Sequence, residues 1–419
     1  MDNERTSQEK KGFSLTRRQF AQSLAVTALM SPVVLRNARA ASTIKMGSIL
    51  DLSGGLDIYG KPMQMVMQMA VDEINASGGL NGSELEIVSY DTQSNMQLYA
   101  QYAQQAALQD RVDFVNGGIT SASREVIRPI LRRYNALYFY STQYEGGVCD
   151  RNAFCTGITP AMQEKNAIEW AVKKWGAKMY SIGADYNAPR IMSDWARKYG
   201  EAVGGAQVAN EFFPLDVTEF GPLITKIQAA KPDFVCSTLV GAAHLGFYRQ
   251  WAAAGMVGKI PILSFTFGAG NEHTMLPASE SEGIVASYSY LEEIDNPANK
   301  AFLTSYREKY GANAVYQNNI SIGAYEATWL WATAVRTAGT AEREKVIEAL
   351  EAGTTWVGPA GALKMDGATH HCARDIRLAE LKDGKWHILE EWEDQQPLDT
   401  ANRCDLLKDP SQNTQFTAE

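Results

Sequence analysis

The sequence predicts an α/β protein made of two doubly wound lobes. Between residues 43 and 265, short apolar segments alternate with segments whose apolar residues recur at helical spacing. This alternation is typical of parallel sheets that helices cover on both faces. The pattern restarts after Gly157-Ile158-Thr159-Pro160, which indicates two similar units in tandem, each with its own sheet. At 419 residues, the chain is long enough for two hydrophobic cores.

The first unit begins with a strand and a helix. Residues 43–50 form an apolar run that ends in Asp51-Leu52-Ser53-Gly54-Gly55. Pro62 suits the first turn of the next helix, which we expect to end at Gly78-Gly79 and to bury a stripe rich in methionine. The same reasoning predicts further strands at 85–91 and 112–116 and one from residue 137, with helices at 98–109 and up to about residue 134.

The second unit repeats this order. One of its helices is expected to be capped by Asp216 or Thr218 and to run to about residue 230. The other predicted helices are 163–175, 191–203 and 242–254, and the predicted strands are 178–183, 207–213, 233–238 and 260–265.

The pattern is looser from residue 283 onward. A hairpin turn at Lys382-Asp383-Gly384 is expected to join two short strands, 375–381 and 386–392. Residues 395–419 are expected to form an extended or partly disordered tail. Before the hairpin, the pattern predicts a strand at 283–288 and helices at 297–310, 320–338 and 341–352.

The first 40 residues read as an export signal. Arg17 and Arg18 precede a mildly apolar run, and Ala38-Arg39-Ala40 matches a signal-peptidase site, so we expect a twin-arginine signal peptide that is cleaved after Ala40. Cleavage removes seven Lys or Arg and three Asp or Glu, which changes the net charge from −9 to −13. We therefore expect an acidic protein in the periplasm. Its negative charge argues against nucleic acid as a partner.

The five cysteines all follow the predicted signal peptide. In an oxidising compartment, Cys149 and Cys155 are expected to close a short loop, and Cys372 and Cys404 are a second possible pair. Cys236 lies in an apolar strand pattern and is expected to be a buried free thiol.

Polar, uncharged residues follow the predicted strands. Residues 137–147 begin as an apolar aromatic run and then turn into hydroxyls, a carboxylate and glycines. Because the carboxyl ends of parallel strands meet at one edge, where ligands bind, we expect these loops to form a small-molecule cleft. The other loops are 117–123, 185–189, 238–244 and 265–271.

Enzyme chemistry is disfavoured. No nucleophile elbow, P-loop or dinucleotide-binding glycine motif follows a strand, and the chain has five histidines. The cluster His370-His371-Cys372 lacks the spaced partners of a metal site and is expected to be a surface loop. We therefore expect no cofactor, no metal and no catalytic residue.

Four segments resemble a known family. Asp51-Leu52-Ser53-Gly54-Gly55 and the segments 117–124, 139–146 and 183–190 are similar to the branched-chain amino acid/amide substrate-binding proteins of ABC transporters, specifically their urea and short-chain amide branch. Tyr-Glu-Gly and Asp-Tyr-x-x-Pro-Arg are the motifs that point to this branch. The resemblance covers about residues 43–392.

The resemblance implies a type I periplasmic binding fold, in which two lobes close on a ligand and then engage a membrane permease. Three hinge crossovers are expected near 158–162, 285–290 and 351–356. The first lobe would then comprise 41–160 and 286–352, and the second 161–285 and 353–394.

Matching positions also imply the ligand contacts. Ser121 and Thr142 resemble the hydroxyls that bind the ligand from the first lobe, next to Thr120 at the start of a helix. Tyr140 resembles a cleft aromatic, and Tyr186 the cover from the second lobe. The cleft strand ends of the family match 238–241 and 264–268, which adds the expected contacts Thr238, Gly241 and Phe267.

The ligand is expected to be a small neutral polar solute, urea or a short-chain amide. Relatives that bind amino acids place an acid in the stretch that here reads Ser-Phe-Thr-Phe-Gly, and an unpaired buried ammonium is costly. Asp185, Glu145 or Glu272 could still supply that acid, so a branched-chain or other amino acid is the alternative ligand, and a ligand sensor is an alternative role. Residues 56–60 depart from the urea pattern and could enter the cleft.

Overall fold

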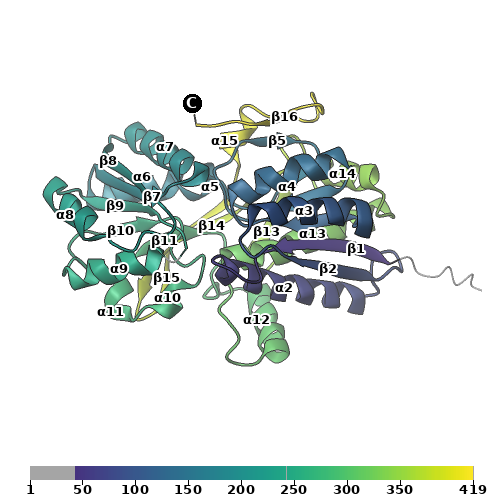
Figure 1. Cartoon of the computed structure of the whole chain (residues 1–419), viewed down its shortest axis with the longest axis horizontal. Helices are drawn as coiled ribbons and strands as arrows, with labels where there is room; N and C mark the ends of the chain where they lie inside the picture. The colour runs from purple at the N-terminus through teal and green to yellow at the C-terminus, as the bar shows by residue number, and fades with distance from the viewer. Residues whose placement is uncertain (1–42, 242, 419) are drawn as a thin grey trace, which may run out of the picture. The chain divides into compact units, whose positions relative to one another are not determined.

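Strands and helices alternate along the chain in the computed structural model, which describes residues 43–241 and 243–418 (Figure 1). The predicted signal peptide lies outside the described residues. The strands are β1 (Ile44–Leu50), β2 (Leu85–Asp91), β3 (Phe114–Gly117), β4 (Leu137–Tyr140), β5 (Val148–Asp150), β6 (Ala153–Cys155), β7 (Lys178–Ala184), β8 (Ala206–Phe213), β9 (Phe234–Thr238), β10 (Ile262–Ser264), β11 (Val285–Tyr288), β12 (Thr355–Gly358), β13 (Gly361–Asp366), β14 (His371–Lys382), β15 (Lys385–Gln395) and β16 (Asn413–Gln415).

The helices follow most strands, as the periodicity predicts. They are α2 (Asp57–Ala76), α3 (Met96–Gln105) with a π-helical turn (Ala106–Asp110), α4 (Ser121–Arg133), α5 (Pro160–Gln163), α6 (Lys165–Trp175), α7 (Asn187–Ala202), α8 (Gly221–Ala230), α9 (Ala243–Ala253), α10 (Glu272–Met275), α11 (Ala278–Ser281), α12 (Pro297–Tyr310), α13 (Asn319–Ala338), α14 (Arg343–Glu351) and α15 (Leu398–Ala401).

The sheet confirms the predicted α/β fold class, but the prediction that each unit has its own sheet is wrong, because β14 joins both units in one 14-stranded sheet. Its order is β2-β1-β3-β4-β6-β14-β11-β10-β9-β7-β8. We call β1–β4 with β6 the first half of the sheet and β7–β11 the second half. Within each half, neighbouring strands run parallel. β14 links the halves, since it pairs with β6 at His371 and antiparallel with β11 from Arg377 to Glu380. β13 pairs antiparallel with β14 from His371 to Ala373, on the edge opposite β6, and β12 pairs with β13. The predicted lobe boundaries stay a proposal.

Helices on both faces bury the apolar side chains. The methionine stripe of α2 is core as predicted, because Met63 and Met67 are fully buried against β1 and α13. Trp331 of α13 stacks on Phe114 of β3, with ring centroids 3.8 Å apart. This packing fixes the amino end of β3 against α13.

The start of α8 differs from the prediction. The helix begins at Gly221, and neither Asp216 nor Thr218 caps it. Phe220 is fully buried between Phe213 and Phe247, and its backbone N–H donates to the side-chain oxygen of Gln250 at 2.7 Å. A tertiary contact therefore replaces the local cap.

The C-terminal tail contains an extended strand, β16, and a short helix, α15. β16 pairs antiparallel with β5, and Cys404 forms a disulfide with Cys149 across 255 residues of sequence. Both predicted pairs, Cys149–Cys155 and Cys372–Cys404, are wrong, because Cys155 and Cys372 are buried free thiols. The prediction for Cys236 is confirmed.

The His370-His371-Cys372 cluster is not a surface loop. All three residues are buried, and His371 begins β14. Nε2 of His371 contacts the hydroxyl of Tyr144, and Nε2 of His370 lies 3.2 Å from Glu351. Burial lowers the pKa of His371 to about 4, so the ring is neutral at pH 7. The cluster is buried because β14 carries it into the middle of the sheet.

The tail also buries a carboxyl group, Asp399. It accepts hydrogen bonds from the Thr159 hydroxyl and the Ala161 backbone N–H, each at 2.9 Å. Burial raises the pKa of Asp399 from 3.8 to about 6 despite these bonds. In the unfolded chain Asp399 loses its proton near its ordinary pKa of 3.8, whereas in the folded protein it keeps the proton up to about pH 6. The stability that protonated Asp399 contributes is therefore full below about pH 4 and is lost as the pH rises through about 6.

We expect Asp399→Asn to remove this pH dependence. Between pH 4 and pH 7, the stability of the variant relative to the native protein should rise by about 3 kcal/mol. Thermal unfolding of both proteins across this range measures the difference, since urea is a candidate ligand of this protein. Parallel stability curves would show that Asp399 does not titrate as described.

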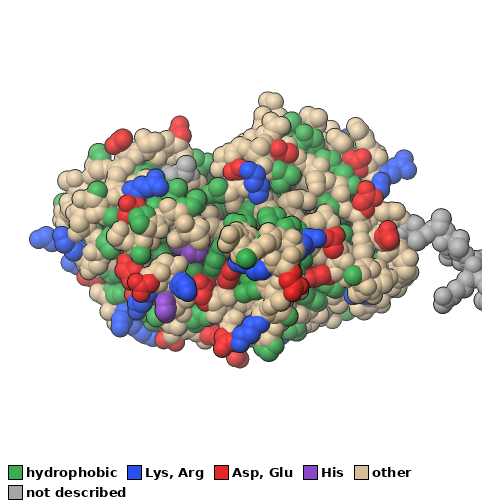
Figure 2. Space-filling model, turned by 90° about the horizontal axis from the view of Figure 1, so that it is seen from below, with side chains coloured by type: hydrophobic (Ala, Val, Ile, Leu, Met, Phe, Trp, Pro, Cys, Tyr) green, Lys and Arg blue, Asp and Glu red, His purple; other side chains and the backbone are tan. Residues whose placement is uncertain are grey.

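The surface carries mixed charge. On the face seen in Figure 2, acidic and basic side chains are interspersed and do not form a basic band. Among residues 43–241 and 243–418, no helix combines the length and apolar character that spanning a bilayer requires.

Candidate functional site

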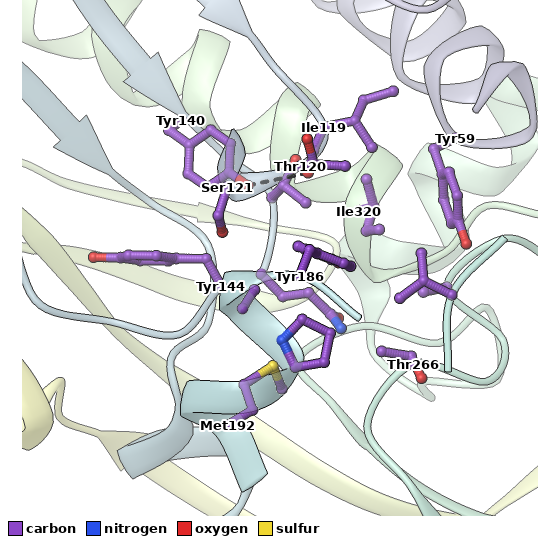
Figure 3. A pocket seen from close by; sticks show the side chains of 16 residues that line it. Tyr59, Ile119, Thr120, Ser121, Tyr140, Tyr144, Tyr186, Met192, Thr266 and Ile320 are labelled. Carbon is purple, nitrogen blue, oxygen red and sulfur yellow. Dashed lines mark hydrogen bonds between the residues drawn. The ribbon is translucent and has the colours of Figure 1, made fainter. Parts of the chain in front are cut away.

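A cavity of about 50 Å³ lies where the ends of several strands meet the start of α4 (Figure 3). Of the predicted contacts, Thr120, Ser121, Tyr140, Thr142 and Tyr186 line it. The remaining lining residues are Tyr59, Ile119, Gln143, Tyr144, Ala188, Pro189, Met192, Val240, Thr266, Ala269 and Ile320.

The start of α4 forms part of the wall. Thr120 caps the helix: its side-chain oxygen accepts the N–H of Ser123 at 3.1 Å, and the Ser123 hydroxyl accepts the N–H of Thr120 at 3.1 Å. This capping box leaves the backbone N–H groups of Ser121 and Ala122, in the first turn, without an intrahelical partner. The site therefore offers backbone donors at this point.

Three hydroxyls of the wall donate their protons to the protein itself. Ser121 donates to the carboxylate of Glu145. Thr142 donates to the carbonyl of Gly118 at 3.2 Å, and Tyr140 donates to the carbonyl of Ile119 at 3.0 Å. Since a hydroxyl has one proton, each can offer a ligand only an acceptor lone pair. This part of the wall therefore accepts hydrogen bonds.

Gln143 is likewise engaged. Its amide nitrogen donates to the carbonyl of Phe265 at 2.6 Å, and its amide oxygen accepts from Asn319 at 3.1 Å. Because Phe265 follows β10 and Asn319 begins α13, the two bonds fix Gln143 between distant segments. Gln143 is therefore fixed in orientation, with one hydrogen bond to each polar atom of its amide.

Tyr59 of α2 and Tyr186, just before α7, close the cavity. Tyr59, in the first turn of α2, accepts the N–H of Gly241 at 3.3 Å, and burial together with the nearby Glu272 carboxylate raises its pKa well above the usual value. Tyr186 precedes α7, and within the described part of the chain its hydroxyl has no hydrogen-bond partner. Tyr186 is therefore the side chain best placed to donate to a ligand.

Three predicted contacts lie outside the lining. The Thr238 hydroxyl donates to the carbonyl of Ile182 at 3.3 Å, and Gly241 contacts the site only through its bond to Tyr59. Phe267 is fully buried, with its ring against Tyr248 and Trp386. Thr238 and Phe267 lie at or just after strand ends, as predicted, but their side chains are buried in the core of the second half of the sheet.

The three acids that could pair with an ammonium group have protein partners. Asp185 is exposed and forms an ion pair with Arg190 at 2.6 Å. Glu145 is fully buried and pairs with Arg124 at 2.9 Å. Glu272 accepts the backbone N–H groups of Gly268 and Gly270, at 2.7 and 3.0 Å. None of the three lines the cavity.

Sequence reasoning missed several wall residues. Tyr59 lies in the stretch 56–60, which the sequence marks as a possible cleft segment without singling out a contact. Ile320 and Met192 belong to α13 and α7, where an apolar residue at helical spacing carries no signal that separates core from cavity. Among the described residues, no group of His, Cys, Asp or Glu could hold a metal ion.

Comparison with known proteins identifies relatives along most of the chain. The family model described as periplasmic binding protein matches residues 43–385. The leucine-, isoleucine-, valine-, threonine- and alanine-binding protein of Pseudomonas aeruginosa is 28% identical over 366 residues, which is 83% of this chain and 91% of the relative. A Leu/Ile/Val-binding protein homologue of Brucella abortus is 23% identical over 295 residues, 65% of this chain and 72% of the relative.

Solved structures have the same architecture. A solute-binding protein of an ABC transporter from Rhodopseudomonas palustris, in complex with p-hydroxybenzoic acid, aligns with a TM-score of 0.78 at 26% identity over 86% of this chain and 100% of that structure. A leucine-, isoleucine-, valine-, threonine- and alanine-binding protein from Brucella ovis, in a closed conformation, aligns with a TM-score of 0.74 at 20% identity over 85% and 97%.

Proposed function

This chain belongs to the periplasmic binding protein family, and from that premise we propose that it delivers urea or a short-chain amide to an ABC importer. It is a solute-binding protein of ABC transporters, a class that binds small molecules and does not transform them. The ligand class that we propose is narrower than the range of ligands bound across the family, and we infer it from the chemistry of the cavity wall.

The observation that supports an amide is the direction of the hydrogen bonds in the wall. Ser121, Thr142 and Tyr140 all donate into the protein, so a ligand meets acceptors there. A small amide brings N–H donors for these oxygens and one carbonyl for the free N–H groups at the start of α4. A carboxylate has no donor, and it would place its charge against these lone pairs.

The size of the cavity agrees with a small ligand. Its volume is about 50 Å³, and the apolar part of its wall includes Ile119, Val240 and Ala269. A neutral planar solute can pack against such a wall without leaving a charge unpaired, whereas an unpaired buried ion costs several kcal/mol. We therefore place urea, formamide and acetamide ahead of larger or charged solutes.

Calorimetric titration of the purified protein tests this proposal. Urea, formamide and acetamide should bind, and each should stabilise the native protein by an amount that grows with the logarithm of one plus its concentration over Kd. Leucine and 4-hydroxybenzoate serve as the competing classes. Binding of either one, with no binding of the three amides, would overturn the proposed ligand class.

A branched-chain or other amino acid is the second candidate. The observation in its favour is the pair of free N–H groups at the start of α4, which can receive a carboxylate as well as a carbonyl. Glu272 is a buried carboxyl group beside the wall residue Tyr59. An amino acid would need Glu272 or another acid to reach its ammonium group, which the wall itself does not supply.

We expect Thr142→Val to weaken ligand binding and to leave the fold intact. Valine has a similar size but removes the acceptor oxygen that Thr142 presents, so affinity for the amide that binds should fall about tenfold. Calorimetry measures the affinity and circular dichroism checks the fold. Unchanged affinity would exclude the Thr142 hydroxyl from the contacts with the ligand.

A further inference from the structure

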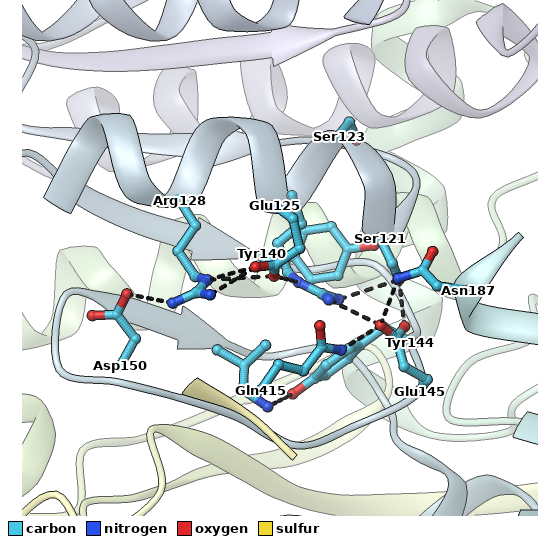
Figure 4. Close-up of polar contacts among 12 residues, drawn as sticks. Ser121, Ser123, Glu125, Arg128, Tyr140, Tyr144, Glu145, Asp150, Asn187 and Gln415 are labelled. Atoms are coloured by element: carbon cyan, nitrogen blue, oxygen red, sulfur yellow. Dashed lines mark hydrogen bonds and ion pairs between the residues drawn. The ribbon is translucent and has the colours of Figure 1, made fainter. Parts of the chain in front are cut away.

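Beneath the cavity lies a buried polar cluster that reaches into the C-terminal tail (Figure 4). Its centre is Glu145, whose side chain is fully buried. Glu145 accepts hydrogen bonds from Ser121 and Gln415, from Arg124 at 2.9 Å, and from Asn187 at 3.4 Å. Gln415 lies 270 residues away in sequence, on β16.

The tail holds Gln415 in place at two points. β16 pairs with β5 through Gln415 opposite Val148, and the disulfide between Cys149 and Cys404 ties the tail to the same strand. Gln415 also donates to the carbonyl of Gly146 at 3.4 Å. Its amide is thus fixed against the turn that carries Glu145.

The cluster determines which way the Ser121 hydroxyl points. Arg124 pairs with Glu145 and also donates to the Ser121 oxygen at 3.2 Å, and its guanidinium lies over the rings of Tyr140 and Tyr144, at 5.1 and 4.6 Å. With Glu145 held by Arg124 and Gln415, the Ser121 proton must point at the carboxylate. Because Arg124 already occupies one lone pair of the Ser121 oxygen, the other lone pair is what Ser121 offers the cavity.

We propose that Gln415 is a positioning residue for the ligand site, so that the tail is a working part of the cleft. It acts through Glu145, which it helps to fix, on the Ser121 hydroxyl that lines the cavity. Gln415 itself does not line the cavity. This inference rests on the proposed function in one respect, because it requires a ligand that contacts Ser121.

A double-mutant cycle in ligand binding tests the proposal. Acetamide is titrated calorimetrically into the native protein, Gln415→Ala, Ser121→Ala and the double variant. Each single substitution should weaken binding about tenfold, and the double variant should bind no more weakly than Ser121→Ala. Non-additivity of this kind is the signature of action through Ser121, whereas a general loosening of the fold would weaken binding in the Ser121→Ala background too.

Thr414→Ala is the matched control. Thr414 is the preceding residue of β16, its side chain is exposed, and alternation along the strand points it away from Gln415. It should bind acetamide like the native protein. Native-like binding by Gln415→Ala, or a double variant about a hundredfold weaker than the native protein, would overturn the positioning role.

The design separates this inference from the ligand proposal. If acetamide fails to bind the native protein and leucine binds instead, the proposed amide ligand is wrong. The same cycle is then measured with leucine, since Ser121 lines the cavity for either solute. A non-additive cycle with leucine would still support the role of Gln415, and an additive one would overturn it.

Discussion

Substitution of Arg124 by methionine should lower the free energy of unfolding by about 3–5 kcal/mol. Arg124 and Glu145 are both fully buried, and their atoms lie 2.9 Å apart. Methionine fills much of the same space but leaves the Glu145 carboxylate without its counter-charge. Breaking a buried ion pair from one side is costly, because the remaining charge has been removed from water without compensation.

Thermal unfolding measures this loss, since urea is itself a proposed ligand, and Arg190→Met is the control. Arg190 pairs with Asp185 at the surface, where the two side chains are 52% and 42% exposed, so its removal should cost at most about 1 kcal/mol. The double variant Arg124→Met/Glu145→Met should be more stable than Arg124→Met, because it also removes the orphaned carboxylate. A loss of less than 1 kcal/mol in Arg124→Met would contradict the buried pair.

Removal of the Cys149–Cys404 disulfide should have the next largest effect. We expect the double variant Cys149→Ser/Cys404→Ser to lose about 2–5 kcal/mol in the free energy of unfolding. The bond joins residues separated by 255 positions, so without it the unfolded chain gains a large amount of conformational freedom. The tail would then be held by the pairing of β16 with β5 and by hydrogen bonds such as those of Asp399 and Gln415.

A reducing agent provides the control within the same experiment. Dithiothreitol should lower the denaturation midpoint of the native protein toward that of the double variant and leave the double variant nearly unchanged. The other cysteines of the described chain, Cys155, Cys236 and Cys372, are free thiols, so reduction has no further bond to break there. An equal shift in both proteins would show that the reductant acts elsewhere.

The sequence predicted the fold and much of the cavity wall because both depend on local patterns. A strand and a helix differ in the spacing of their apolar residues, and that spacing is visible without any tertiary contact. The carboxyl ends of parallel strands share one edge, so Thr120, Ser121, Tyr140 and Thr142 could be placed together before their positions were known. Tyr186 followed from the corresponding strand end in the second unit.

Other parts of the site could not be predicted in this way. Thr238 and Phe267 lie at the expected strand ends, but the second-half core takes up their side chains. The start of α8 and the burial of His371 follow from contacts with distant elements, and these override the local signals for a cap and a loop. Each of these differences is a case in which packing outweighed propensity.

By itself, the sequence determined the α/β alternation, the methionine core of α2 and the edge at which the cavity lies. Only the tertiary structure decided which cysteines pair, which way the hydroxyl protons of the wall point, and that Gln415 reaches Glu145. The physical reason is range. Periodicity acts over a few residues, whereas a disulfide or a buried hydrogen bond joins whichever groups the finished fold brings within a few ångströms of each other.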